Sequence, residues 1–62
     1  MINVGDLVID EYLEKGIITN TTDYKKNGYV EVTFFGGVYG TVVCEINHRF
    51  ITLISRANNE TA

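Results

Sequence analysis

The sequence of 62 residues contains no proline, no tryptophan, a single cysteine and a single histidine. One cysteine cannot form a disulfide within the chain, and it offers a metal ion no second thiolate. A small domain without disulfides suits a reducing compartment. These absences exclude a disulfide-stapled secreted scaffold and a cysteine-based zinc site.

Long apolar runs are also missing, and so is an N-terminal basic leader followed by an apolar stretch. No run approaches the roughly 18 apolar residues that a membrane span needs, and the chain opens with the mixed sequence MINVGDLV. An N-terminus of this kind does not resemble a secretory signal. We therefore predict a cytoplasmic protein that does not enter a membrane.

Basic charge is scarce, because five Lys and Arg stand against eight Asp and Glu, for a net charge of −3. A domain that binds nucleic acid through phosphates normally carries a basic stripe. Four of the acids gather early in the chain, at Asp6, Asp10, Glu11 and Glu14. We interpret them as a solvated face that keeps the protein soluble; the alternative is an acidic surface offered to a basic partner.

No catalytic constellation emerges. His48 has no Ser or Cys at a motif spacing, and we expect it to make a local polar contact with Glu45. The glycine-rich stretch 36–40 is followed by no helix that would complete a phosphate cradle. The sequence therefore predicts a protein that is not an enzyme, with no metal site and no cofactor.

The apolar residues that are present favour strands, since most of the 45% hydrophobic content is Val, Ile, Tyr and Phe. The stretch from Gly28 to Cys44 is the clearest unit, with Gly36-Gly37 predicting a tight hairpin turn between two β-prone runs. Alternation places one set of side chains in the core and a second set, which includes Glu31, on the wet face. The predicted core set is Val30, Val32 and Phe34, and the outer set is Tyr29, Glu31, Thr33 and Phe35.

Shorter β-prone runs on either side predict three further strands, over 2–10, 16–22 and 50–54. The connection 23–27 reads as an exposed, mobile loop, and 45–49 fits a single helical turn. Gly40 in the returning strand suggests a bulge or bend. We predict one domain over residues 1–55 and a flexible tail over 56–62.

Taken together, VGDLV, the Gly16-Ile17-Ile18 step, VEVTFFGG and INHRFITLIS resemble the SH3-like small β-barrels in their Tudor and KOW-like forms. They are especially similar to short SH3-like proteins encoded by bacteriophages. The resemblance implies an all-β, five-stranded barrel with a one-turn helix before the last strand. It also implies a binding scaffold that uses loops and exposed aromatics, acting in the host cytoplasm if the protein is encoded by a phage.

Our leading hypothesis is a small non-enzymatic interaction module that binds a host or phage protein, or its own copies, through the central hairpin. The candidate partner-binding residues are the aromatics Tyr12, Tyr24, Tyr29, Phe35 and Tyr39. The exposed aromatics of the hairpin could instead form a second small core beneath the Tyr24 loop.

Two alternative functions remain open at this point. One is a KOW-like module that binds RNA or DNA through Lys25, Lys26 and Arg49, with Tyr24 beside them. The other is an acidic mimic of a nucleic-acid backbone that inhibits a host protein.

Overall fold

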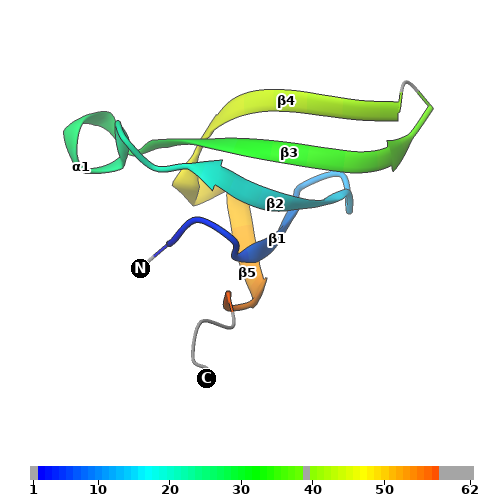
Figure 1. The fold of residues 1–62 in the computed structure, drawn as a ribbon, viewed down its shortest axis with the longest axis horizontal. Helices are drawn as coiled ribbons and strands as arrows, with labels where there is room; N and C mark the ends of the chain where they lie inside the picture. Colours follow the sequence, from blue (N-terminus) through cyan, green and yellow to red (C-terminus); the bar gives the residue numbers. More distant parts are fainter. Residues whose placement is uncertain (1, 39, 58–62) are drawn as a thin grey trace.

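The protein forms one five-stranded antiparallel sheet with two short helical turns. The computed structural model, shown in Figure 1, describes residues 2–38 and 40–57. Along the chain the elements are β1 (Leu7–Asp10), β2 (Lys15–Asn20), α1 (Tyr24–Asn27), β3 (Tyr29–Gly37), β4 (Gly40–Asn47), the 3₁₀ helix η1 (His48–Phe50) and β5 (Ile51–Ser55). The order across the sheet is β4-β3-β2-β1-β5. The predicted five strands and a helical turn before the last one are confirmed, but the turn was predicted over 45–49: residues 45–47 continue β4, and the turn is His48–Phe50.

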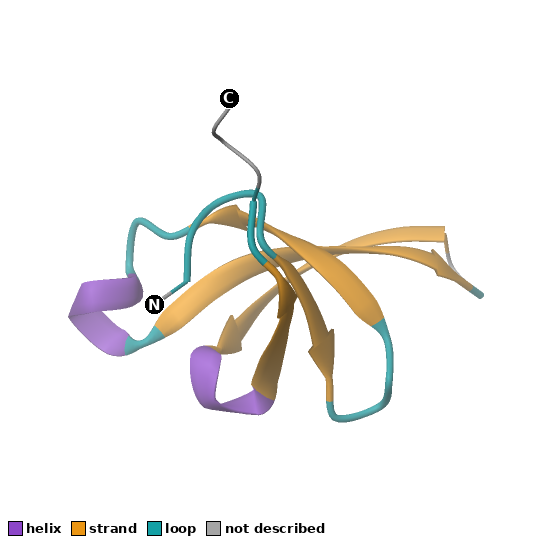
Figure 2. Cartoon of the chain, turned by 90° about the horizontal axis from the view of Figure 1, so that it is seen from below, coloured by secondary structure: helices purple, strands orange, loops and turns teal. Residues whose placement is uncertain are grey.

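The sheet is strongly curved, so that β1 and β5 cross beneath β2, β3 and β4 (Figures 1 and 2). Its inner face carries the buried core of Val8, Ile18, Val30, Val32 and Phe34. A ring of half-buried side chains surrounds this core: Ile2, Tyr24, Cys44, Ile46, Ile51 and Leu53. The alternation in β3 therefore predicted the core residues of that strand correctly.

Gly16 of β2 pairs with Phe34 of β3, and the residues of β3 leave no room for a side chain at this position. A Cβ atom added at Gly16 would lie 2.6 Å from Val32 Cγ1 and 2.9 Å from the Thr33 carbonyl oxygen. Real Cβ contacts are not this short, and the backbone oxygen cannot move aside without shifting β3. Glycine is required here because the core side chains of β3 occupy the space over β2.

The N-terminal segment differs from the predicted strand, since β1 begins only at Leu7 and Val4 is 54% exposed. Asp6 is buried, with 1% of its surface exposed. Its carboxylate accepts hydrogen bonds from the backbone N–H groups of Asn3 (2.8 Å) and Ala57 (2.7 Å). Asp6 thus joins the two ends of the described chain, and its assignment to a solvated acidic face was wrong. Residues 58–62 of the predicted tail lie outside the described residues.

The loop between β1 and β2 is organised by Asp10, whose Oδ1 accepts from the N–H groups of Tyr12 and Glu14, each at 2.8 Å. Leu13 adopts a positive φ of 67° in this turn. Tyr12 and Leu13 consequently point into solvent, at 84% and 79% exposed. They do not add to the core.

The connection predicted as a mobile loop contains the single helical turn α1 instead. Gly28, at φ 82°, caps α1 in the left-handed region, and its N–H donates to the Tyr24 carbonyl at 2.8 Å. Glycine reaches this conformation without steric cost. The cap turns the chain directly into β3, while Tyr24 packs against the core.

The hairpin turn lies two residues later than predicted. Gly37 pairs with Gly40, so the chain reverses between them, and Gly36 has φ 76° within β3. Phe34 pairs with Val42, which leaves Phe35 and Gly36 opposite Thr41 alone. Two residues facing one constitute a β-bulge. The bulge therefore lies in β3, whereas Gly40 flanks the turn.

We predict that Gly16→Ala lowers the free energy of unfolding by about 1–3 kcal/mol, because the new methyl group overpacks the contact between β2 and β3. Gly37→Ala is the matched control: the nearest atom to its added Cβ lies at 4.0 Å, and we expect a change below about 0.5 kcal/mol. Urea denaturation followed by circular dichroism measures both. Equal effects of the two substitutions would contradict the close packing at Gly16.

Candidate interaction site

β3 and β4 continue past the rest of the sheet as a two-stranded ribbon (Figure 1). The pairing of β2 with β3 ends at Gly16 and Phe34, so among the described residues β4 is the one strand that pairs with β3 beyond Phe34. We call the described residues 35–38 and 40–43 the distal ribbon. Two strands without a third, or without a covering layer, are marginally stable in water.

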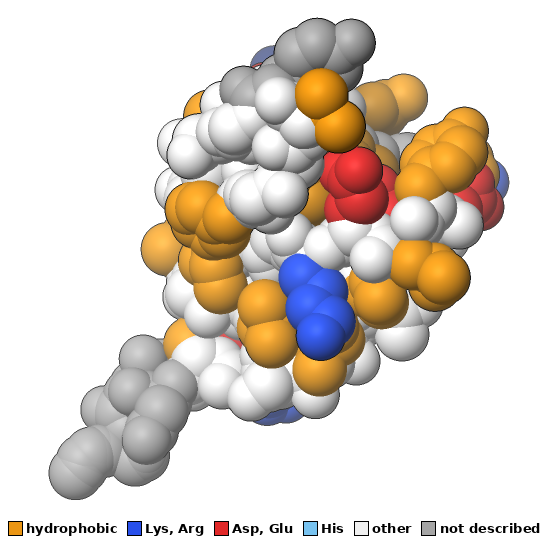
Figure 3. Space-filling model, turned by 90° about the vertical axis from the view of Figure 1, so that its right-hand side faces the viewer, with side chains coloured by type: hydrophobic (Ala, Val, Ile, Leu, Met, Phe, Trp, Pro, Cys, Tyr) orange, Lys and Arg blue, Asp and Glu red, His pale blue; other side chains and the backbone are white. Residues whose placement is uncertain are grey.

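The distal ribbon is apolar and carries no charged residue. Its exposed apolar side chains are Phe35 (57%), Val38 (96%), Val42 (38%) and Val43 (57%). Clustered exposure of this kind on a small protein marks an interaction surface more often than scattered single residues do. Seen from the side on which the ribbon ends, hydrophobic side chains surround a cationic side chain near the middle of the molecule (Figure 3).

The outer face of the sheet carries a transverse row in direct register, in which Leu7 pairs with Ile17, Ile17 with Thr33, and Thr33 with Val43. Leu7, Ile17 and Thr33 are half-buried, and exposure is greatest at Val43 in the last strand. This largely apolar row therefore ends at the open edge of β4.

The predicted aromatic residues are not gathered into one patch. Tyr29 and Phe35 share the outer face of β3 but are six residues apart, about 20 Å along a strand. Tyr29 is 42% exposed, whereas Tyr24 is half-buried and its ring packs edge-on against His48 at 5.2 Å. Tyr12 lies on the β1–β2 turn, and the predicted contact residue Tyr39 lies outside the described residues. The alternative of a second small core does not fit the described aromatics, because Tyr24 packs against the main core and Tyr29 and Phe35 are exposed.

A shallow cleft of about 230 Å³ lies beside Tyr29. Its lining residues are Asn20, Thr22, Asp23, Tyr29, Val30, Glu31 and Glu45. Glu31 and Glu45 face each other directly across β3 and β4, and like charges at such positions destabilise a sheet. Thr19 partly compensates by donating its hydroxyl to Glu31 Oε1 at 2.7 Å. Sequence reasoning missed this pair, which becomes visible only from the strand register.

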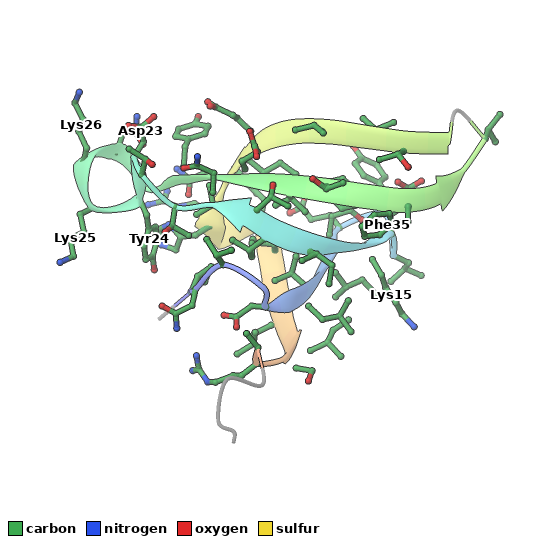
Figure 4. All side chains as sticks on the ribbon, in the orientation of Figure 1. Lys15, Asp23, Tyr24, Lys25, Lys26 and Phe35 are labelled. Atoms are coloured by element: carbon green, nitrogen blue, oxygen red, sulfur yellow. The ribbon has the colours of Figure 1, made fainter. Side chains whose placement is uncertain are left out.

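The predicted cations Lys25, Lys26 and Arg49 lie at the opposite end of the sheet from the distal ribbon. His48 joins η1 to α1, because its Nδ1 lies 3.0 Å from the Gly28 carbonyl oxygen. This contact takes the place of the one predicted with Glu45. Lys25 and Lys26 point to different sides of α1, while Phe35 and Lys15 lie at the other end of the molecule (Figure 4).

Within residues 2–38 and 40–57, no three His, Cys, Asp or Glu side chains are grouped so that they could hold a metal ion. Cys44 is half-buried and packs against the core. In the same residues neither short helix has the length and apolar character to cross a membrane. The distal ribbon and the cleft beside Tyr29 are two features of the described residues from which a function can be argued.

The chain was compared with protein-family models, with curated proteins and with solved structures. None of them matches it. The functional argument therefore depends on the geometry of the described residues.

We predict that Glu45→Gln raises the free energy of unfolding by about 0.2–1 kcal/mol, because it removes the repulsion between two carboxylates that face each other. The gain should shrink at high salt, which screens exposed charges. Denaturation at low and high ionic strength measures it, with Glu14→Gln on the exposed β1–β2 turn as the control. An unchanged or lowered stability at low salt would contradict a net repulsion between Glu31 and Glu45.

Proposed function

We propose that the protein is a small, non-enzymatic interaction module that binds a protein partner through the distal ribbon. The observation that carries this proposal is the ribbon itself: it is exposed, apolar and uncharged, and no third strand of the described chain pairs with it. A partner that covers it would bury apolar surface that the chain's own core does not reach. We place this activity in the cytoplasm, with a host or phage protein or a second copy as partner.

An SH3-like fold in its Tudor or KOW-like form is part of the same proposal. It is supported by the strand order β4-β3-β2-β1-β5, the curvature of the sheet and the η1 turn directly before β5. Within the described residues, β4 and β5 have no hydrogen-bonded strand on their outer sides. The barrel of this proposal is therefore an open one, in which the curved sheet leaves the edges of β4 and β5 unpaired with each other.

Phe35 is the proposed anchor of the binding surface. Aromatic side chains are over-represented among the residues that dominate binding energy, and Phe35 lies at the bulge, on the same side as Val43. Tyr29 marks the other end of the outer face of β3. Tyr24 has a structural role in this scheme, because it packs between the core and His48.

We expect Phe35→Ala to reduce partner recovery at least about tenfold in affinity purification of the tagged protein from its native cell, as loss of a central aromatic anchor does. Combining it with Tyr29→Ala should weaken binding further. Phe50→Ala is the matched control, because Phe50 is similarly exposed (49%) but lies on η1. Undiminished recovery with a folded Phe35→Ala protein would refute the proposal.

Nucleic-acid binding of the KOW type is the second candidate function. The contact between His48 and Gly28 brings η1 next to α1 and thereby places Arg49 at the same end as Lys25 and Lys26. The divergence of the two lysines (Figure 4) and the net charge of −3 oppose a continuous phosphate track. Three cations at one end are still the arrangement that this function would use.

This second function predicts a complex with a short RNA or DNA oligonucleotide that weakens steeply with salt, since counterion release drives such binding. Replacing Lys25 and Lys26 together by Gln should abolish it, and Lys15→Gln at the far end should leave it intact. Fluorescence anisotropy at low ionic strength measures the binding. Absence of any anisotropy change there would eliminate this candidate.

The third function considered, an acidic mimic of a nucleic-acid backbone, would need the early carboxylates to be exposed together. Asp6 is buried and Asp10 is committed to the backbone of its turn. Of the early acids, Glu11 and Glu14 remain exposed. Two carboxylates on one turn do not imitate a phosphate backbone, and we do not propose this function.

A further inference from the structure

We propose that the open edge of β4 pairs antiparallel with the β4 edge of a second copy of this chain, about a two-fold axis at Val43. This inference rests on the proposed function, because the edge belongs to the distal ribbon, and it names the partner. The dimer would join two five-stranded sheets into one continuous sheet.

The hydrogen-bond pattern of β4 shows which backbone groups face outward. The His48 N–H donates to the Gly28 carbonyl at 2.8 Å, next to the pair of Tyr29 and Asn47. In an antiparallel ladder, hydrogen-bonded and non-hydrogen-bonded pairs alternate. Gly28 and His48 thus form a hydrogen-bonded pair, and counting along the register makes Val32 and Cys44 another one. Val43 and Glu45 lie in the alternate positions and direct their N–H and C=O groups away from β3. Thr41 does so by the same alternation.

This edge lacks the devices that usually prevent strand pairing. Natural sheets protect open edges with lysine, proline, inward charges, bulges or very short strands. β4 is eight residues long, carries no lysine or proline, and has Glu45 as its one charged residue. The bulge of the hairpin lies in β3, so β4 itself stays regular at its outer side. Its edge is consequently ready to accept another strand.

A two-fold axis perpendicular to the sheet fixes which registers are open to a second copy. It keeps outer-face residues on the outer face. The outward N–H and C=O groups of β4 can pair about a centre at Thr41, Val43 or Glu45, or about a centre between them at Val42 or Cys44. A centre at Glu45 would oppose two carboxylates, and a centre at Thr41 would run the strands past the hairpin turn. A centre at Val42 pairs fewer residues of β4. A centre at Cys44 pairs as many as Val43 but sets the two Glu45 carboxylates on diagonal positions two residues apart along the strand. Val43 as the centre instead places each Glu45 opposite the Thr41 of the other copy.

The spacing of the Glu45 carboxylates and the side chains on the outer face both favour pairing with a second copy in this register. The two Glu45 carboxylates would be four residues apart along the strand, about 13 Å, which exceeds the screening length at 0.1 M salt of about 10 Å. Each carboxylate would have a threonine hydroxyl opposite it. On the outer face, the row of Leu7, Ile17, Thr33 and Val43 would continue through the axis into the same row of the second copy.

Sedimentation equilibrium of the full chain tests the inference. We expect a monomer–dimer equilibrium, weakened at least about tenfold in both Val43→Lys and Val43→Glu, because like charges would meet at the axis. An equimolar mixture of these two variants should regain the dimer, since Lys and Glu then face each other. Val4→Lys is the control, because Val4 is similarly exposed (54%) but lies in the segment before β1, away from β4.

A second variant covers the case in which a charge at position 43 prevents folding. Thr41→Lys places a cation opposite the Glu45 of the other copy and should tighten the dimer. A parent chain that stays monomeric, a dimer indifferent to both Val43 variants, a mixture that stays monomeric, or growth into larger polymers would each overturn the inference. A monomeric chain that still captures its partner through Phe35 would overturn this inference alone and leave the proposed function standing.

Discussion

Burial in this protein is confined to one side of one sheet. Five apolar side chains are fully enclosed, and they come from β1, β2 and β3. The absence of a Cβ atom at Gly16 leaves the space in which Val32 and Phe34 pack over β2. Asp6 then ties the segment before β1 to the segment after β5. The arrangement of every other element depends on this small enclosed volume, because no second layer formed by residues 2–38 and 40–57 covers the outer face.

The same limit explains why the distal ribbon is the functional candidate. Strands that extend past the core keep their backbone hydrogen bonds to each other but gain no buried side chains. A sequence selected only for stability would shorten such a ribbon or place charges on it. This chain instead places Phe35, Val38, Val42 and Val43 there. Its charged residues lie in the other parts of the chain, including Glu31 and Glu45 beside Tyr29.

The sequence predicted what is local and periodic. Alternation in β3 identified Val30, Val32 and Phe34 as core, and the apolar runs located the five strands to within a few residues. The sequence could not predict strand register, because register depends on how distant segments meet. The pair Glu31–Glu45, the position of the turn after Gly37 and the bulge at Phe35 all follow from that register.

Asp6 shows a second limit of prediction. A carboxylate in an acidic stretch resembles a solvated side chain, and nothing local indicates that it will accept hydrogen bonds from Ala57, 51 residues away. Tyr12 and Tyr29 illustrate the related difficulty for the site. Aromatic residues could be counted from the sequence, but whether they converge depended on the turn at Leu13 and on the length of β3.

Amide hydrogen exchange at two adjacent residues of β4 tests the central claim that this edge is an interface. The Cys44 N–H points toward β3 and should be protected at every protein concentration. The Val43 N–H points outward, and we expect it to exchange quickly in dilute protein and slowly in concentrated protein, as the edge becomes covered. Fast exchange at Val43 at all concentrations, beside a protected Cys44, would contradict the claim.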